Sequence, residues 1–163
     1  MEIYLIRHGI AATRGTYSQD ELRPLTEKGR IKTAKVAEKL LDVGLKFDAI
    51  LTSPLTRAYQ TAEILQKAGL GQKIEPFSAL KPDGNIEEWL KWQQQWYLKN
   101  KDGKLALVGH QPDLGNWTEL LVWGTIKEQL TLKKAGIIGL KLPPIGTPLC
   151  RSTLFLLTSP KWL

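Results

Sequence analysis

Two short apolar runs, each followed by a histidine, constrain the fold of this chain more than any other feature. Residues 3–6 lead directly into Arg7 and His8, and residues 104–109 lead directly into His110. A short run that is apolar on both faces is typical of a central strand in a parallel sheet. His8 and His110 are the two histidines of the chain, and each is predicted to lie where a buried strand ends.

Strand-like and helical segments alternate along the rest of the chain. Further strands are predicted at residues 48–52, 73–76, 136–142 and 151–157, and helices at residues 26–44, 54–69, 85–98 and 112–123. Residues 10–25 have no clear periodicity and are predicted to form a loop. The alternation predicts an α/β fold, a three-layer sandwich in which helices flank a mostly parallel central sheet. The chain of 163 residues has no evident linker, so residues 1–163 are predicted to form a single domain.

The composition predicts a cytoplasmic protein that does not enter a membrane. Hydrophobic residues make up 42% and charged residues 24% of the chain, which is ordinary for a soluble globular protein. No apolar stretch approaches the roughly 20 residues that span a bilayer. The N-terminus has neither a basic leader nor a small-residue cleavage site. The single cysteine, Cys150, agrees with a reducing compartment.

The formal net charge of +7 favours an anionic partner. The basic residues are dispersed, and no basic run is longer than Lys133-Lys134. This dispersion argues against nucleic acid as the partner. The remaining candidates for the anionic partner are a phosphorylated substrate and an acidic protein surface.

Chemistry-bearing residues follow three of the predicted strands. His8, with Arg7, follows the first, Arg57 lies shortly after the second, and His110 follows the fourth. Ligands of open parallel sheets bind beyond the carboxyl ends of the strands, so these four residues are predicted to meet at one edge. Guanidinium groups match phosphate oxygens, and a neutral imidazole accepts a phosphoryl group covalently. The sequence therefore predicts a phosphoryl-transfer site.

Small residues at the same strand ends are predicted to assist phosphate binding. Ser53 and Pro54 are typical of a helix N-cap followed by proline in the first helical position. The free N–H groups at such a helix start bind anions. Gly9 and Gly109 have no side chain and are expected to let substrate approach the backbone closely.

Together these motifs resemble the histidine phosphatase superfamily, whose fold is that of phosphoglycerate mutase. The shared features, in chain order, are Arg7-His8-Gly9, Ser53-Pro54-x-x-Arg57-Ala58-x-x-Thr61 and a late second histidine. The short chain, with Arg23-Pro24-Leu25-Thr26 and His110-x-Pro112, resembles the SixA-type phosphohistidine phosphatases in particular. The resemblance covers roughly residues 1–125.

The resemblance implies a role for each matching residue. His8 would be the nucleophile and form a phosphohistidine intermediate. Arg7, Arg57 and His110 would surround the phosphoryl oxygens, and Arg23 lies where SixA-type proteins also have an arginine near the pocket. No cofactor is implied.

The general acid of the larger family members has no clear counterpart. The nearest candidate is Asp83, within a Pro-Asp-Gly sequence that is also a natural turn former. A phosphohistidine substrate needs less help from an acid, because a protonated imidazole is already a good leaving group, whereas an alcohol phosphate needs proton donation. Asp83 is therefore either a substrate-binding acid or a turn residue.

These features predict a phosphatase that removes phosphate from phosphohistidine of a signalling protein, such as a histidine-containing phosphotransfer domain. Two alternatives remain: a phosphatase of small phosphate esters, and a non-catalytic phosphoprotein-binding module. Metal catalysis is not expected, because no ligand pairs have zinc spacing. The oligomeric state is left open.

Three tryptophans, Trp89, Trp92 and Trp96, repeat at helical spacing. The pattern predicts one packed face of a helix. Docking of a partner protein is the alternative use of exposed tryptophans.

Overall fold

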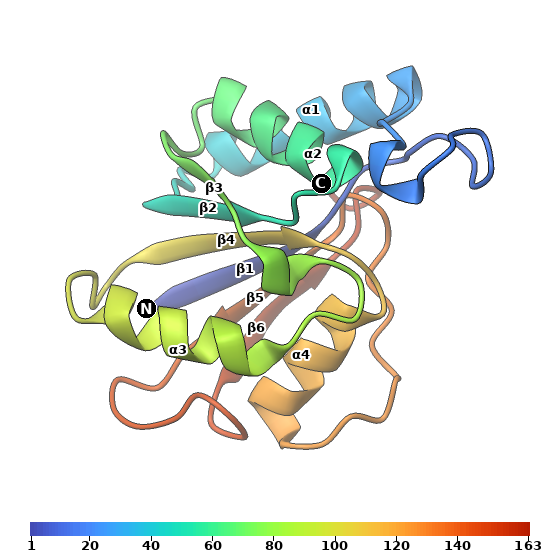
Figure 1. The fold of residues 1–163 in the computed structure, drawn as a ribbon. Coiled ribbons are helices and arrows are strands. Elements are labelled where there is room, and N and C mark those ends of the chain that lie inside the picture. The colour runs from blue at the N-terminus through green and yellow to red at the C-terminus, as the bar shows by residue number, and fades with distance from the viewer.

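A single six-stranded sheet, in the order β3-β2-β4-β1-β5-β6, forms the centre of the computed structural model, which describes residues 1–163 (Figure 1). Its strands are β1 (Glu2–Arg7), β2 (Ala49–Thr52), β3 (Ile74–Pro76), β4 (Lys104–Gly109), β5 (Ile137–Lys141) and β6 (Thr153–Thr158). The first four strands are parallel, whereas β5 runs antiparallel to both of its neighbours. The central strands β1 and β4 are buried on both faces, as their apolar runs predicted.

Helices cover both faces of the sheet. They are α1 (Glu27–Asp42), α2 (Thr56–Lys67), α3 (Ile86–Tyr97) and α4 (Asp113–Trp123). The helices α1 and α2 pack on one face, and α3 and α4 on the other (Figure 1). A separate apolar core fills each of the two interfaces. The predicted three-layer α/β sandwich with a mostly parallel sheet is confirmed.

Local signals place most helix ends correctly. The Thr26 hydroxyl accepts a 3.0 Å hydrogen bond from the Gly29 N–H at the start of α1. Asn85 caps α3 in the same way, through Glu87 N–H. Gly124 ends α4 with φ of +74°, a backbone conformation that glycine adopts without strain.

The predicted helix start at Ser53-Pro54 is wrong. Helix α2 begins at Thr56, with Leu55 in the N-cap position. The Ser53 N–H still donates to the Val108 carbonyl of β4 at 2.9 Å, so the residue extends strand β2. The Ser53 hydroxyl accepts from the Leu55 N–H at 3.3 Å and lies 2.9 Å from His110 Nε2, so it binds within the turn that precedes the helix and does not cap the helix itself.

The tryptophans on α3 pack against the sheet. Trp89 is fully buried, and its ring centroid lies 6.0 Å from that of Trp117 on α4. Trp92 and Trp96 are half-buried against the same core and stack on each other at 5.9 Å. The predicted packed face is confirmed.

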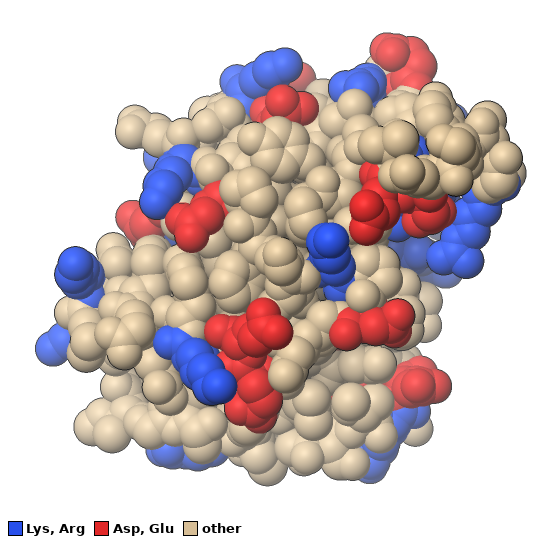
Figure 2. Space-filling view, viewed as in Figure 1, with Lys and Arg blue, Asp and Glu red and all other residues tan.

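The surface shows no concentration of one charge on the face in Figure 2, where basic and acidic side chains are interspersed. No helix of the structure combines the length and the apolar character needed to cross a bilayer. The predicted loop at residues 10–25 lies beyond the carboxyl ends of β1 and β4 (Figure 1) and contains the short 3-10 helix η1 (Asp20–Leu22).

Candidate active site

The carboxyl ends of β1, β2 and β4 lie side by side and bring the two histidines together. Arg7 at the end of β1 is in register with Gly109 at the end of β4. His8 and His110 are the next residues of the two strands, and their ring centroids are 5.2 Å apart. Arg57, in the first turn of α2, lies at the same edge.

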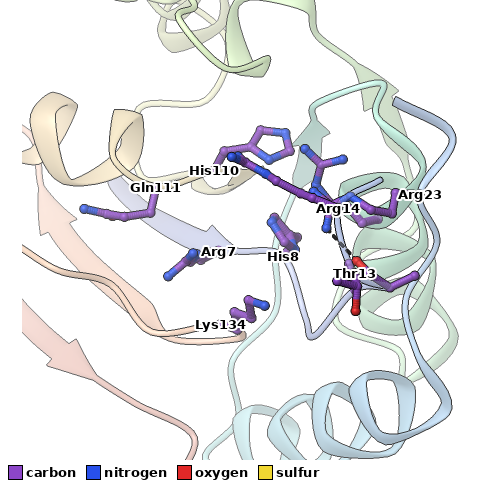
Figure 3. Close-up of a pocket in the computed structure, with 11 residues that line it drawn as sticks. Arg7, His8, Thr13, Arg14, Arg23, His110, Gln111 and Lys134 are labelled. Atoms are coloured by element: carbon purple, nitrogen blue, oxygen red, sulfur yellow. Dashed lines mark hydrogen bonds between the residues drawn. The ribbon is translucent and has the colours of Figure 1, made fainter. Parts of the chain in front are cut away.

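A cavity of about 410 Å³ opens at this edge. Its lining contains four arginines, one lysine and both histidines, and no carboxylate; the lining residues are Arg7, His8, Ala11, Ala12, Thr13, Arg14, Arg23, Arg57, His110, Gln111 and Lys134. Figure 3 shows these polar side chains around a common space, with His8 between His110 and Lys134. The charge of the lining suits an anion.

His8 is arranged as a nitrogen nucleophile. Its Nδ1 lies 2.7 Å from the Gly9 carbonyl oxygen. A carbonyl oxygen only accepts, so Nδ1 carries the ring proton and Nε2 keeps its lone pair. Burial, together with repulsion by His110 in its protonated form and by Arg57 and Arg7, lowers the pKa of His8 to about 3. The ring is therefore neutral at physiological pH and able to attack.

His110 is held by Ser53. The His110 Nε2 and the Ser53 Oγ are 2.9 Å apart, and Ser53 Oγ accepts a 3.3 Å hydrogen bond from Leu55 N–H. The Ser53 hydroxyl has no other acceptor, so it donates to Nε2, and the proton of the neutral ring lies on Nδ1. Burial and nearby arginines lower the pKa of His110 to about 3. Ser53 thus contacts the site through His110 and does not line the cavity.

The arginines are tied together by a carboxylate that the sequence analysis did not identify. Asp20 in η1 forms salt bridges with Arg23 Nε at 2.8 Å and with Arg57 Nη2 at 2.9 Å. These two arginines hold the pKa of the Asp20 carboxyl below its ordinary value, so it stays ionised and orients both guanidiniums. The Nε atoms of Arg7 and Arg57 are buried without a hydrogen-bond partner.

Like Ser53, the predicted substrate contacts Gly9, Gly109 and Asp83 lie outside the cavity lining. Gly9 is buried, its N–H donates to Thr61 Oγ1 at 3.0 Å, and a Cβ there would overlap the Thr33 hydroxyl. The glycine therefore allows close packing of helix α1 rather than close approach of substrate. Asp83 is exposed at φ of +62°, and its N–H donates to the Asp113 carboxylate. The turn interpretation fits this placement.

Sequence reasoning missed several residues at the rim, including Thr13, Arg14, Gln111 and Lys134. Gln111 directly follows His110, so the prediction that His110 belongs to the site could also have pointed to Gln111. In the sequence, Lys134 stood out only as a member of the basic pair Lys133-Lys134. Arg14 and Thr13 lie in the loop without periodicity, which carries no local signal for a site.

Acid is expected to destabilise the fold through the two buried imidazoles. Their pKa values of about 3 lie below the ordinary 6.5, so between these values the unfolded chain binds protons that the folded chain does not. The free energy of unfolding should therefore fall as pH drops from 6.5 toward 3, by up to about 1.4 kcal/mol per pH unit for each histidine. Urea unfolding between pH 7 and pH 4, in phosphate-free buffer, measures the slope.

The double variant His8→Asn/His110→Asn is the control for this prediction, because it keeps the carboxylates that also titrate in acid. Its stability should decline less steeply than that of the wild type. Equal slopes would show that the two histidines are not responsible.

Fold and site together define a class: an α/β protein with two neutral, buried histidines in a cationic pocket at the carboxyl edge of its sheet. Comparisons with known proteins identify the family. The model of the histidine phosphatase superfamily (branch 1) matches residues 3–110. The chain is also 51% identical, over 164 residues, to an uncharacterized protein of Picosynechococcus sp., covering 100% of this chain and 99% of that one. The chain belongs to the histidine phosphatase superfamily.

Solved structures share the fold. The protein histidine phosphatase SixA, solved with tungstate, has a TM-score of 0.85 at 23% identity, covering 99% of this chain and 98% of that one. The alpha-ribazole phosphatase of Shigella flexneri has a TM-score of 0.70 at 20% identity, covering 98% and 97%. The phosphoglycerate mutase-like fold predicted from the motifs is confirmed, and family and site support a phosphatase.

Proposed function

We propose that this protein is a cofactor-independent phosphatase that removes the phosphoryl group from phosphohistidine of a protein. The observation that carries the proposal is the pairing of a neutral nucleophile, His8, with a cationic cavity that has no carboxylate on its lining. The carboxylate of Asp20, which binds the cavity residues Arg23 and Arg57, is ionised. Such a site stabilises phosphoryl charge but offers no carboxylic acid to a leaving group.

Phosphohistidine is the substrate class that suits this site. The lone pair of His8 Nε2 forms a bond to phosphorus while the P–N bond of the substrate breaks. The electron pair returns to the substrate ring, whose other nitrogen already carries a proton, and the ring leaves as neutral imidazole. An alkyl phosphate would leave as an alkoxide and would need a proton in the same step.

Water completes the reaction. Its oxygen attacks the phosphorus of phosphorylated His8, and the P–N bond breaks with its electron pair returning to Nε2. Both protons of the water leave with the inorganic phosphate. His8 is then neutral again, with its Nδ1–H directed to the Gly9 carbonyl.

The substrate assignment is tested by comparing two donors. A phosphorylated histidine-containing phosphotransfer domain is expected to be turned over with a kcat/KM at least about 10²-fold above that of an alkyl phosphate, the usual worth of a general acid. Faster turnover of the alkyl phosphate would overturn the substrate claim. If turnover of the alkyl phosphate were then lost in Asp83→Asn, that loss would favour a phosphatase of small phosphate esters.

Labelling separates catalysis from simple binding. With radiolabelled donor, wild-type protein should carry acid-labile phosphate, and His8→Ala should carry none. Binding of the phosphoprotein with neither turnover nor label would identify a non-catalytic binding module instead.

A further inference from the structure

The segment between α4 and β5, residues 124–136, has no regular secondary structure and contributes Lys134 to the lining of the cavity. We call it the wall loop. The backbone N–H groups of its residues 127–130 all donate to the carboxylate of Glu119 on α4. Glu119 is only 1% exposed, and these N–H groups, Lys127 first among them, lower its pKa. A buried, ionised carboxylate with four donors fixes the loop firmly.

Residues of the pocket hold the same loop from the other side. The Gln111 side chain donates to the Leu130 carbonyl at 2.7 Å and accepts from the Leu132 N–H at 3.4 Å. Arg7 Nη1 donates to the Leu132 carbonyl at 2.7 Å. These contacts couple the wall loop to the residues beside both histidines.

The end of the wall loop is bonded directly to the segment that carries the nucleophile. The Ala135 N–H is shared between the carbonyls of Arg7, at 3.0 Å, and His8, at 3.2 Å. The preceding residue, Lys134, lines the cavity beside His8 (Figure 3). Its neighbour Lys133 lines a different hollow, together with Leu157 and Trp162.

Lys134 has no carboxylate partner. None of the salt bridges of the structure includes it. Burial and the charges of Arg7, Arg23 and Arg57 lower its pKa. These like charges repel one another, and an anion bound among them would offset the repulsion. The phosphoryl group of a substrate bound beside His8 would be an anion of this kind.

We propose that Lys134 donates to a non-bridging oxygen of the phosphoryl group bound at His8, and that Glu119 positions Lys134 by holding the wall loop. Lys134 is thereby a substrate-binding residue, and Glu119, which does not reach the cavity, is a positioning residue. The inference deepens the proposed phosphatase function and rests on it, but its test measures anion binding and needs no turnover.

The two adjacent lysines provide a matched pair for the test of Lys134. The probe is inorganic phosphate, whose Kd is measured by titration calorimetry at constant ionic strength. Lys134→Gln is expected to raise the Kd about tenfold or more, as for loss of a charged hydrogen bond. Lys133→Gln makes the same charge change outside the cavity and should stay within about twofold, because Lys133 does not line the cavity and solvent screens its charge from the bound anion.

Equal effects of the two lysine variants would overturn the role of Lys134. So would the lack of measurable phosphate binding by the wild-type chain. If Lys134→Gln weakens phosphate binding but no donor is turned over, the proposed function fails and the anion-binding role stands.

The role of Glu119 is tested through its coupling to Lys134. Glu119→Gln replaces two acceptor oxygens by one acceptor and one donor, and is expected to raise the phosphate Kd. In the background of Lys134→Gln the same change should have a smaller effect, because both act on one contact. Additive effects would overturn the positioning role. Should Glu119→Gln not fold, Glu119→Asp, which keeps the charge with a shorter reach, replaces it in the same cycle.

Discussion

Replacing His8 with alanine is expected to lower kcat by about 10⁴-fold or more, as the loss of a nucleophile does in covalent catalysis. The buried imidazole is kept neutral by a pKa of about 3, and its Nδ1 is bonded to the Gly9 carbonyl, which leaves Nε2 free. No serine or cysteine lines the cavity, and the other side chains on its lining that could act as nucleophiles are Thr13, His110 and Lys134. Steady-state turnover of a phosphohistidine protein measures the effect.

The His8→Ala variant should remain folded and should still bind inorganic phosphate, because the arginines that form the pocket are unchanged. Circular dichroism and phosphate titration provide these controls. Turnover within tenfold of the wild type, in a folded variant, would exclude a phosphohistidine intermediate at His8.

Replacing Arg57 with lysine is expected to lower kcat/KM by about 10²-fold or more, the usual cost of one donor to transition-state charge. Arg57 is only 3% exposed, and its Nη1 and Nη2 are both engaged by Asp20. Lysine keeps the charge but offers a single ammonium in place of a planar fork. It therefore cannot bind Asp20 and the substrate together in the same geometry.

Arg30→Lys is the matched control, because Arg30 lies on α1 and does not line the cavity. It makes the same substitution and should leave kcat/KM unchanged. If Arg57→Lys and Arg30→Lys were equally active, Arg57 would have no part in stabilising the phosphoryl group.

Much of the fold and the centre of the site were predictable because both depend on short-range patterns. The apolar runs before His8 and His110 identified two buried strands, and the rule for the carboxyl ends of parallel strands brought these histidines to one edge. The observed register of β1 and β4 confirms that arrangement. Arg57 followed from the same rule, because it lies in the first turn of the helix after β2.

The errors share one cause. Ser53 matched a helix cap, yet its backbone is bonded to β4 and its hydroxyl to His110. Gly9 was predicted to let substrate approach the backbone, yet helix α1 packs against it. In both cases a partner far away in the chain competes with the local signal and prevails.

The sequence by itself determined the order of strands and helices, the burial of β1 and β4, and the meeting of two histidines with Arg7 and Arg57. Periodicity and chain direction suffice for these features, because each depends on neighbouring residues and on the common direction of parallel strands. Only the tertiary structure decided that Asp20 binds two arginines and that Glu119 anchors the wall loop beside His8. The contacts of Asp20 with Arg57 and of Glu119 with the wall loop each join an irregular segment to a helix. The relative position of the two depends on how the whole sheet and its helices pack, and no local pattern encodes that position.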